Sequence, residues 1–383
     1  MIEAHGIPYV LERPIVGRLS ARPDPLLEEF PLISLVQDAR DVGIHKDSIA
    51  FVTNLSREEW DKSGGSTCKP GVFSVDNAGV FHHADGVALL PSGKTLLVYR
   101  PGSNSNVLFV TSECNSNCLM CSQPPEKGNG SDLADLAFAA LPIMDPETDL
   151  LCITGGEPTL LGEMLLRLVD TINKRFPLLD LHILSNGRYF AETERAESLA
   201  KVGHPRLLIG IPLFSDNPYD HDSITQVRGS FSQTVKGIIN LARFGIAVEI
   251  RIVMVRLTVT RLERLAQFIW ANFPFVSQVC FMGVEPTGRA EQHLSEIWQD
   301  PAEYQSALER AVEYLCLRGI HTNIYNEQLC VLNRRLWKYA RKAISDWKNT
   351  YIEECTGCTV MDRCGGFFAS AVSGAHSRAI RRV

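Results

Sequence analysis

The sequence predicts an α/β fold with a parallel sheet in its central part. From about residue 107, short apolar runs alternate with segments of helical spacing, which is the pattern of βαβ units. The six runs are 107–110, 150–153, 181–184, 207–211, 247–255 and 279–282. Because the runs are almost continuously apolar, we expect a sheet covered on both faces. Six strands fall short of a full eight-unit barrel, which leaves a partial barrel or an open doubly wound sheet.

The regions on either side of this core differ from it. Residues 1–104 carry Pro and Gly between short alternating stretches such as Thr95–Tyr99, which indicates a small β-rich domain. Such a domain could offer a strand edge for peptide capture, a cap or a surface for a partner. After an expected helix over 302–317, the chain becomes irregular. We therefore predict three domains, at 1–104, 105–319 and 320–383.

Composition narrows the classes of function. The 383 residues are 45% hydrophobic and 21% charged, as in ordinary globular proteins. A net charge of −6 argues against a broad nucleic-acid-binding face. No apolar run approaches the roughly 18 residues of a membrane span, and the first residues do not resemble a secretory signal. We therefore expect a cytoplasmic protein, in which clustered cysteines bind metal more often than they form disulfides.

The eleven cysteines contain two groups. Cys114, Cys118 and Cys121 form a C-x3-C-x2-C run directly after the first apolar run. A closed zinc site needs four ligands, whereas a four-iron cluster on three thiolates keeps one iron open for an external ligand. The second group has four thiolates, enough for a fully ligated iron–sulfur cluster or a closed zinc site. Its members are Cys330, Cys355, Cys358 and Cys364.

Polar turns follow the next two predicted strands. Gly155-Gly156-Glu157-Pro158 follows the second strand, and its glycines let backbone amides approach a ligand closely. Ser185-Asn186-Gly187 follows the third. Because the carboxyl ends of parallel strands meet at one rim, we expect both turns to lie beside the first cysteine group.

Taken together, these motifs resemble the signature of the radical S-adenosylmethionine (SAM) superfamily. The resemblance implies a partial (β/α)6 barrel whose three cysteines hold a [4Fe–4S] cluster, with SAM chelating the open iron. Reductive cleavage of SAM would then give a 5′-deoxyadenosyl radical. The cofactor contacts that the resemblance implies are Met120, Gly155, Gly156, Glu157, Ser185, Asn186, Ser215 and Arg251. Met120 stands where the superfamily often has an aromatic residue. Pro212 occupies the position of the usual serine contact, so Ser215, Asp216 or Asn217 would serve instead.

Two further segments leave alternatives open. Glu249 and Arg251 alternate with apolar residues on the fifth strand, so both should face the barrel interior. There Arg251 would contact the cofactor, or it would only pair with Glu249. The segment Glu285–Ala290 resembles the superfamily's Pro-x-Gly-Arg-Ala sequence, and its role could equally be a structural turn.

The second cysteine group resembles the auxiliary-cluster domains of peptide-modifying radical enzymes. Phe368 stands where the larger version of that domain has another cysteine, so the shorter, twitch-like version with one auxiliary [4Fe–4S] cluster is implied. Spacing alone does not distinguish this cluster from zinc.

The most detailed resemblance is to the C-type maturase of the His-Xaa-Ser system. The strings that carry it are 114–125, 325–330, 344–349 and 355–368. This resemblance implies a peptide or small protein substrate with His-Xaa-Ser repeats, a second radical SAM maturase, and an electron donor such as flavodoxin or ferredoxin. A radical SAM enzyme acting on a small molecule or nucleobase, and a non-catalytic iron–sulfur or zinc scaffold, remain as alternatives.

Overall fold

The computed structural model describes the chain except for residues 1, 43–46, 65–68, 127–129, 344–349 and 372–374. Cys68 and the string 344–349, on which part of the resemblance rests, therefore lie outside the described residues. The chain divides into two compact units. The first comprises Met1–Thr111, Gly130–Ile153 and Thr171–Leu179, and the second comprises Ser112–Asn129, Thr154–Asp170 and Asp180–Val383. The three domain ranges expected from the sequence stay a prediction.

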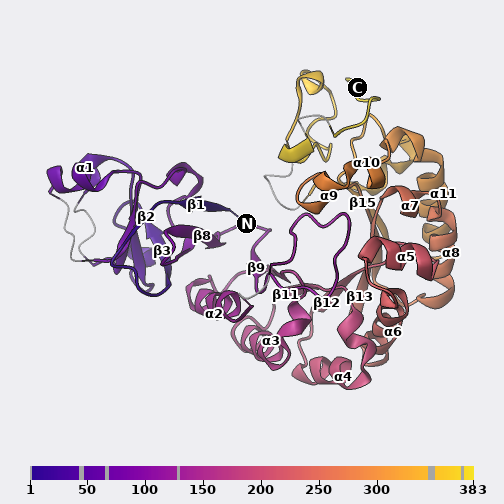
Figure 1. Cartoon of the computed structure of the whole chain (residues 1–383), viewed down its shortest axis with the longest axis horizontal. Helices are drawn as coiled ribbons and strands as arrows, with labels where there is room; N and C mark the ends of the chain where they lie inside the picture. Colours follow the sequence, from indigo (N-terminus) through magenta and orange to yellow (C-terminus); the bar gives the residue numbers. More distant parts are fainter. Residues whose placement is uncertain (1, 43–46, 65–68, 127–129, 344–349, 372–374) are drawn as a thin grey trace. The chain divides into compact units, whose positions relative to one another are not determined.

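The first unit contains a mixed sheet of eight described strands (Figure 1), in the order β1-β8-β7-β3-β4-β5-β6-β2. The strands are β1 (Glu3–His5), β2 (Ile7–Tyr9), β3 (Ile15–Ser20), β4 (Leu32–Val36), β5 (Ala50–Thr53), β6 (Gly71–Phe73), β7 (Gly86–Leu89) and β8 (Lys94–Tyr99). β3 to β6 pair in parallel, and the other pairs are antiparallel. Helix α1 (Arg57–Lys62) connects β5 to β6.

Gly6 separates β1 from β2, so one short segment supplies both edges of this sheet. β1 pairs with β8, and β2 pairs with β6. A Cβ atom at Gly6 would lie 2.4 Å from the carbonyl oxygen of Phe73, so a larger residue would separate the strands. Each edge strand is three residues long. This leaves little free backbone for the peptide capture by strand addition that the sequence suggested.

The second sheet also has eight described strands, in the order β16-β15-β14-β13-β12-β11-β10-β9. They are β9 (Val107–Phe109), β10 (Leu150–Thr154), β11 (Asp180–Leu184), β12 (Leu207–Pro212), β13 (Ala247–Val253), β14 (Gln278–Met282), β15 (Thr322–Tyr325) and β16 (Ala340–Arg341). β11 to β16 pair in parallel. Strands that follow one another in the sequence lie side by side in the sheet. Its two ends are formed by different strands, β9 and β16, so the described strands do not close into a full barrel. The α/β fold with a parallel sheet in a partial barrel is confirmed.

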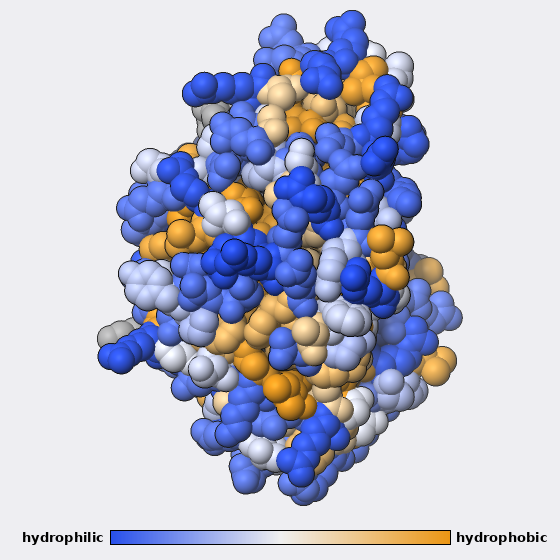
Figure 2. Space-filling model, turned by 90° about the vertical axis from the view of Figure 1, so that its right-hand side faces the viewer, coloured by the Kyte–Doolittle hydropathy of each residue, from blue (hydrophilic) through white to orange (hydrophobic). Residues whose placement is uncertain are grey.

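Helices alternate with the strands of this sheet. They are α2 (Gly130–Ala140), α3 (Glu163–Arg175), α4 (Thr193–Val202), α5 (Pro218–Thr225), α6 (Ser230–Arg243), α7 (Arg256–Val259), α8 (Leu262–Asn272), α9 (Arg289–Gln292), α10 (Leu294–Ile297) and α11 (Gln305–Cys316). α6, α8 and α11 bury apolar residues such as Ile238, Leu265 and Leu308. Figure 2 looks onto the side with α8 and α11, where hydrophobic groups form separate patches in a mainly hydrophilic surface.

The six apolar runs of the sequence correspond to β9 to β14, whereas β15 and β16 were not expected. β15 reads Thr-Asn-Ile-Tyr, so polar residues interrupt the apolar pattern that reveals a strand. Its Asn323 is nevertheless buried and donates to the side chain of Gln278 at 2.9 Å. Within the described part of the chain, no helix has the length and apolar character needed to cross a membrane.

Candidate active site

The first cysteine group lies in the loop that follows β9. Its members are half-buried: Cys114, Cys118 and Cys121. The loop runs beside the end of α5, where the N–H groups of Asn117 and Leu119 donate to the carbonyls of Thr225 and Ile224, each at 3.0 Å. Because these are backbone hydrogen bonds, they hold the path of the loop whatever side chains it carries.

Burial disfavours the thiolate form of all three thiols of this loop. Burial raises the pKa of Cys114 to about 11. Burial, together with smaller effects of the neighbouring thiols of Cys114 and Cys121, raises the pKa of Cys118 to about 12. Burial also raises the pKa of Cys121. The mutual effects indicate that the three sulfurs are neighbours. Binding a metal centre must release their protons, because the thiolate is the ligand.

The arrangement of these thiols suits a cluster better than a single ion. Among the described residues, no three His, Cys, Asp or Glu side chains converge closely enough to hold one metal ion. An iron–sulfur cluster places each thiolate on a different iron, so its ligands do not have to converge on one point. The three neighbouring thiols of the first group therefore fit a [4Fe–4S] cluster.

Glu157 joins the loop after β10 to the loop after β11. Its side chain is fully buried. Oε1 accepts from Ser185 Oγ at 2.8 Å, and from the N–H and hydroxyl of Thr159 at 3.1 and 2.6 Å. Oε2 accepts from the N–H of Asn186 at 2.7 Å. Burial raises the pKa of this carboxyl, and the four hydrogen bonds act in the opposite direction. Glu157 thus braces two rim loops, and its predicted contact with the cofactor stays a prediction.

Gly156 allows the loop after β10 to touch the cysteine loop. A Cβ atom there would lie 2.2 Å from the carbonyl oxygen of Glu113, a distance that no side chain can adopt. The same carbonyl accepts from the N–H of Glu157 at 2.7 Å. The glycine predicted to approach a cofactor therefore approaches the neighbouring backbone. Gly155 precedes it on the same loop.

The loop after β11 holds the middle of the cysteine loop. Asn186 Nδ2 donates to Asn115 Oδ1 at 2.6 Å. Arg188 Nη1 donates to the carbonyl of Asn115 and to Ser116 Oγ. Arg188 was not among the residues predicted from the sequence. It directly follows the predicted Ser-Asn-Gly turn, so its loop could be identified, but its partners depend on the tertiary fold.

Ser215 and Met120 are engaged within the protein. Ser215 is buried; its Oγ accepts from the N–H of Asn217 at 3.1 Å and lies 3.4 Å from a carboxylate oxygen of Asp220. Met120 packs in a buried apolar cluster with Phe214. Met120 belongs to the cysteine loop, and Ser215 follows Phe214, which packs with Met120. The roles of Met120 and Ser215 toward SAM stay predictions.

Arg251 forms the ion pair that the sequence analysis gave as its alternative. Its Nη1 lies 3.0 Å from Glu249 Oε1, and Glu249 also accepts from the side chain of Gln278. Glu249 is buried, and Arg251 is partly exposed. Contact of Arg251 with the cofactor stays a prediction.

The segment after β14 holds the far end of the cysteine loop. The N–H of Arg289 donates to the carbonyl of Cys121 at 2.9 Å, and Nη1 donates to Asn117 Oδ1. Gly288 has a φ of +62°, and a Cβ atom there would lie 2.6 Å from the carbonyl of Ser122. This segment therefore turns sharply against the cysteine loop.

The second cysteine group also comes together. Burial raises the pKa of Cys330, and the thiols of Cys364 and Cys355 raise it further. Burial likewise raises the pKa of Cys355, with added effects from Cys364 and Cys358. The N–H of Leu329 donates to the sulfur of Cys364 at 3.4 Å. Four thiols are enough for a fully ligated cluster or for zinc, and, like those of the first group, they do not converge closely enough in the described part of the structure to hold one metal ion.

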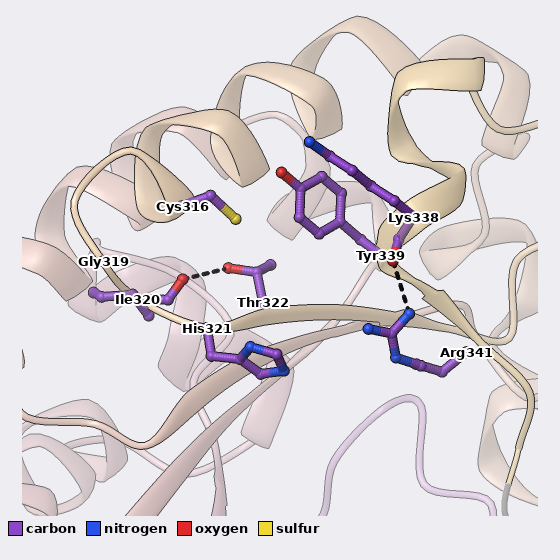
Figure 3. Close-up of a pocket in the computed structure, with 8 residues that line it drawn as sticks. All are labelled: Cys316, Gly319, Ile320, His321, Thr322, Lys338, Tyr339 and Arg341. Carbon is purple, nitrogen blue, oxygen red and sulfur yellow. Dashed lines mark hydrogen bonds between the residues drawn. The ribbon is translucent and has the colours of Figure 1, made fainter.

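A surface cavity of about 390 Å³ lies apart from these groups. Figure 3 shows it at the start of β15, with Tyr339 and Lys338 opposite Cys316 and the Arg341 guanidinium donating to the carbonyl of Lys338. Its lining contains no residue predicted to bind a cluster or SAM: Cys316, Gly319, Ile320, His321, Thr322, Lys338, Tyr339 and Arg341.

Comparison with known proteins assigns the central region of the chain to a protein superfamily. Residues 108–269 match the family model of the radical SAM superfamily. A probable GTP 3′,8-cyclase of Methanocella arvoryzae is 28% identical over 134 residues, which are 34% of this chain and 41% of that protein. The chain therefore spans less than half of this curated relative.

Solved structures that are similar to this chain have low sequence identity and TM-scores below 0.5. SuiB of Streptococcus suis, bound to its precursor peptide SuiA, has a TM-score of 0.47 and 16% identity, covering 60% of this chain and 49% of that chain. The protein anSMEcpe, with bound AdoMet and Kp18Cys peptide, has a TM-score of 0.49 and 15% identity, covering 72% and 91%. The assignment of residues 108–269 as a radical SAM domain rests on the family model, and the cofactors of that superfamily are a [4Fe–4S] cluster and SAM.

Proposed function

We propose that this chain is a radical SAM maturase in which Cys114, Cys118 and Cys121 hold the cluster that binds SAM. The observation that carries the proposal is the cysteine loop itself. Its three neighbouring thiols lie within the matched domain, and hydrogen bonds from the loops after β10, β11 and β14 fix its backbone. Three thiolates without a fourth protein ligand are what a SAM-chelating cluster requires.

The residues of the chain would position the cofactors and exclude water. When bound, the cluster and SAM supply a 5′-deoxyadenosyl radical that abstracts a hydrogen atom from the substrate. Glu157 fixes the loops that carry Gly155, Ser185 and Asn186, so the rim needs little rearrangement when SAM binds. The apolar cluster around Met120 would shield one side of the cysteine loop. A dry, fixed site limits side reactions of a radical.

We further propose a ribosomally made peptide or small protein as the substrate, with His-Xaa-Ser repeats. The resemblance of residues 114–125 and 325–330 to the C-type maturase supports this choice. The second group, from Cys330 to Cys364, would hold an auxiliary [4Fe–4S] cluster that relays electrons or anchors the substrate. A second radical maturase and a flavodoxin or ferredoxin would act with the chain.

Anaerobic reconstitution tests the radical chemistry. We expect about eight irons per chain and release of 5′-deoxyadenosine from SAM. Cys118→Ala should abolish that release. Cys280→Ala is the matched control, because Cys280 is buried outside both groups, and it should retain cleavage. Cleavage that survives Cys118→Ala would refute the assignment, and zinc retained at the second group would exclude electron relay there.

A substrate comparison separates the two enzyme classes. The reconstituted chain is incubated with a peptide of His-Xaa-Ser triplets and, separately, with GTP, since the curated relative is a probable GTP 3′,8-cyclase. A mass change in the peptide supports the maturase. Conversion of GTP alone would establish the small-molecule alternative, and iron binding without SAM cleavage would establish the scaffold.

A further inference from the structure

Two arginines reach the cysteine loop from different rim loops. In Arg188, both Nε and Nη1 have hydrogen-bond partners within the protein. Nε donates to Gln233 Oε1 at 2.7 Å, and Nη1 donates to Asn115 and Ser116. Arg289 differs. Its Nη1 donates to Asn117 Oδ1, but its Nε is buried and has no hydrogen-bond partner in the described part of the chain.

An unpaired buried N–H of a charged group is unfavourable, so it indicates a missing acceptor. Arg289 is tied to the third cysteine by its own backbone, because its N–H donates to the Cys121 carbonyl at 2.9 Å. Its Nη1 reaches Asn117 in the same loop. The backbone and the side chain of Arg289 therefore both lie against the loop that carries the proposed cluster ligands.

The backbone contacts would persist without this side chain. The sharp turn at Gly288 and the bond from the Arg289 N–H to Cys121 do not require a guanidinium. Support of the loop therefore accounts for the hydrogen bond from Nη1 to Asn117. It does not account for the burial of Nε without an acceptor among the described residues.

We propose that Nε of Arg289 donates a hydrogen bond to a sulfur of the cluster held by Cys114, Cys118 and Cys121, and that its charge raises the reduction potential of that cluster. The inference rests on the proposed function for the identity of the ligands. Reduction adds negative charge to the cluster, and nearby positive charge and donors to sulfur stabilise the reduced form. Arg289 would thus adjust the reduction potential of the cluster and would take no part in the abstraction of hydrogen from the substrate.

A reductive titration of the reconstituted full chain, without SAM, tests the proposal. The SAM-binding cluster is identified by the change in its electron paramagnetic resonance signal when SAM is added to a parallel sample. At the wild-type midpoint potential, the ratio of reduced to oxidised cluster should be about tenfold lower in Arg289→Gln, which is a shift of about 59 mV to lower potential for one electron. Arg289→Lys retains the charge without the Nε donor and should shift less in the same direction.

Asn117→Ala is the matched control, because it removes the bracing hydrogen bond and keeps Nε. It should retain the wild-type potential. An equal shift in Asn117→Ala, or an unchanged potential in Arg289→Gln, would overturn the proposal. So would loss of iron in both Arg289 variants, which would make the residue a brace for the loop. An unchanged potential together with weaker SAM binding would assign Nε to SAM instead.

These outcomes are distinct from failure of the proposed substrate. A chain that binds iron and cleaves SAM but leaves the His-Xaa-Ser peptide unmodified would contradict the maturase assignment. The potential of its cluster would still decide the role of Arg289.

Discussion

The two cysteine groups differ in how completely the buried carboxyl group near each of them is hydrogen-bonded. Beside the first, the buried carboxylate of Glu157 accepts four hydrogen bonds, two of them from other rim residues. Beside the second, the buried carboxyl of Glu327 accepts from the hydroxyl of Tyr304 at 2.6 Å, and its Oε2 has no partner among the described residues.

The first site is therefore arranged before any cofactor binds, whereas the second contains a buried carboxyl group with one oxygen that lacks a hydrogen bond among the described residues and so lowers the stability of the fold. The first group sits in a loop whose backbone is fixed before any cofactor binds. Near the second, burial raises the pKa of Glu327 to about 8, because the charged form has too few donors. The first region should therefore be sensitive to steric changes and the second to pH.

The largest effect, a loss of cluster iron, is expected from Gly156→Ala. The added Cβ would meet the backbone of Glu113 at 2.2 Å, so the loop after β10 and the cysteine loop must separate. Iron content should fall from about eight to about four per chain, because only the second cluster assembles. Iron analysis after reconstitution measures this.

Gly79→Ala is the control for that substitution, since nothing lies within 4 Å of a Cβ there. It should leave the iron content unchanged. Full iron loading of Gly156→Ala would show that the rim is less prearranged than the contacts indicate.

Glu157→Ala should have the next largest effect. It removes the acceptor of two N–H groups and two hydroxyls at a buried position, and unpaired buried donors are costly. We expect the free energy of unfolding of the iron-free chain to fall by about 3 kcal/mol, measured by urea denaturation. Glu163→Ala, at an exposed position on α3, should change it by less than about 0.5 kcal/mol. Equal losses would contradict the bracing role of Glu157.

The expected effect at Glu327 differs from the other two because it depends on pH. In the unfolded chain its carboxyl loses its proton near the ordinary value of 4.5, whereas the folded chain keeps the proton up to a pKa of about 8. The folded state therefore binds more protons between these values, so the contribution of this group to stability falls as pH rises from 4.5 to 8.

Glu327→Gln should remove that loss, since an amide oxygen can still accept from Tyr304. We expect the free energy of unfolding of the variant to exceed that of the wild type by a margin that is small at pH 5 and grows steadily up to pH 8, in paired urea titrations of the iron-free chain. A difference that does not change with pH would show that Glu327 is ionised in the folded chain.

Much of the core was predictable, because repeated apolar runs reveal strands that are buried on both faces. The six runs became β9 to β14. β15 was missed because its Asn323 is polar yet buried, and the Gln278 that accepts from its Nδ2 lies on another strand. The pairing of Arg251 with Glu249 was anticipated only as an alternative, since both sit two residues apart on one strand.

The amino-acid sequence alone determined which atoms are available for chemistry: three thiols in one short loop, four more near the end of the chain, and small residues at strand ends. Local spacing suffices for this, because ligands within a few residues share one loop. Only the tertiary structure decided what holds that loop. Asn115 meets Asn186 across 71 positions, and Asn117 meets Arg289 across 172. Such partners depend on how parallel strands bring their carboxyl ends to one rim, which no local pattern specifies.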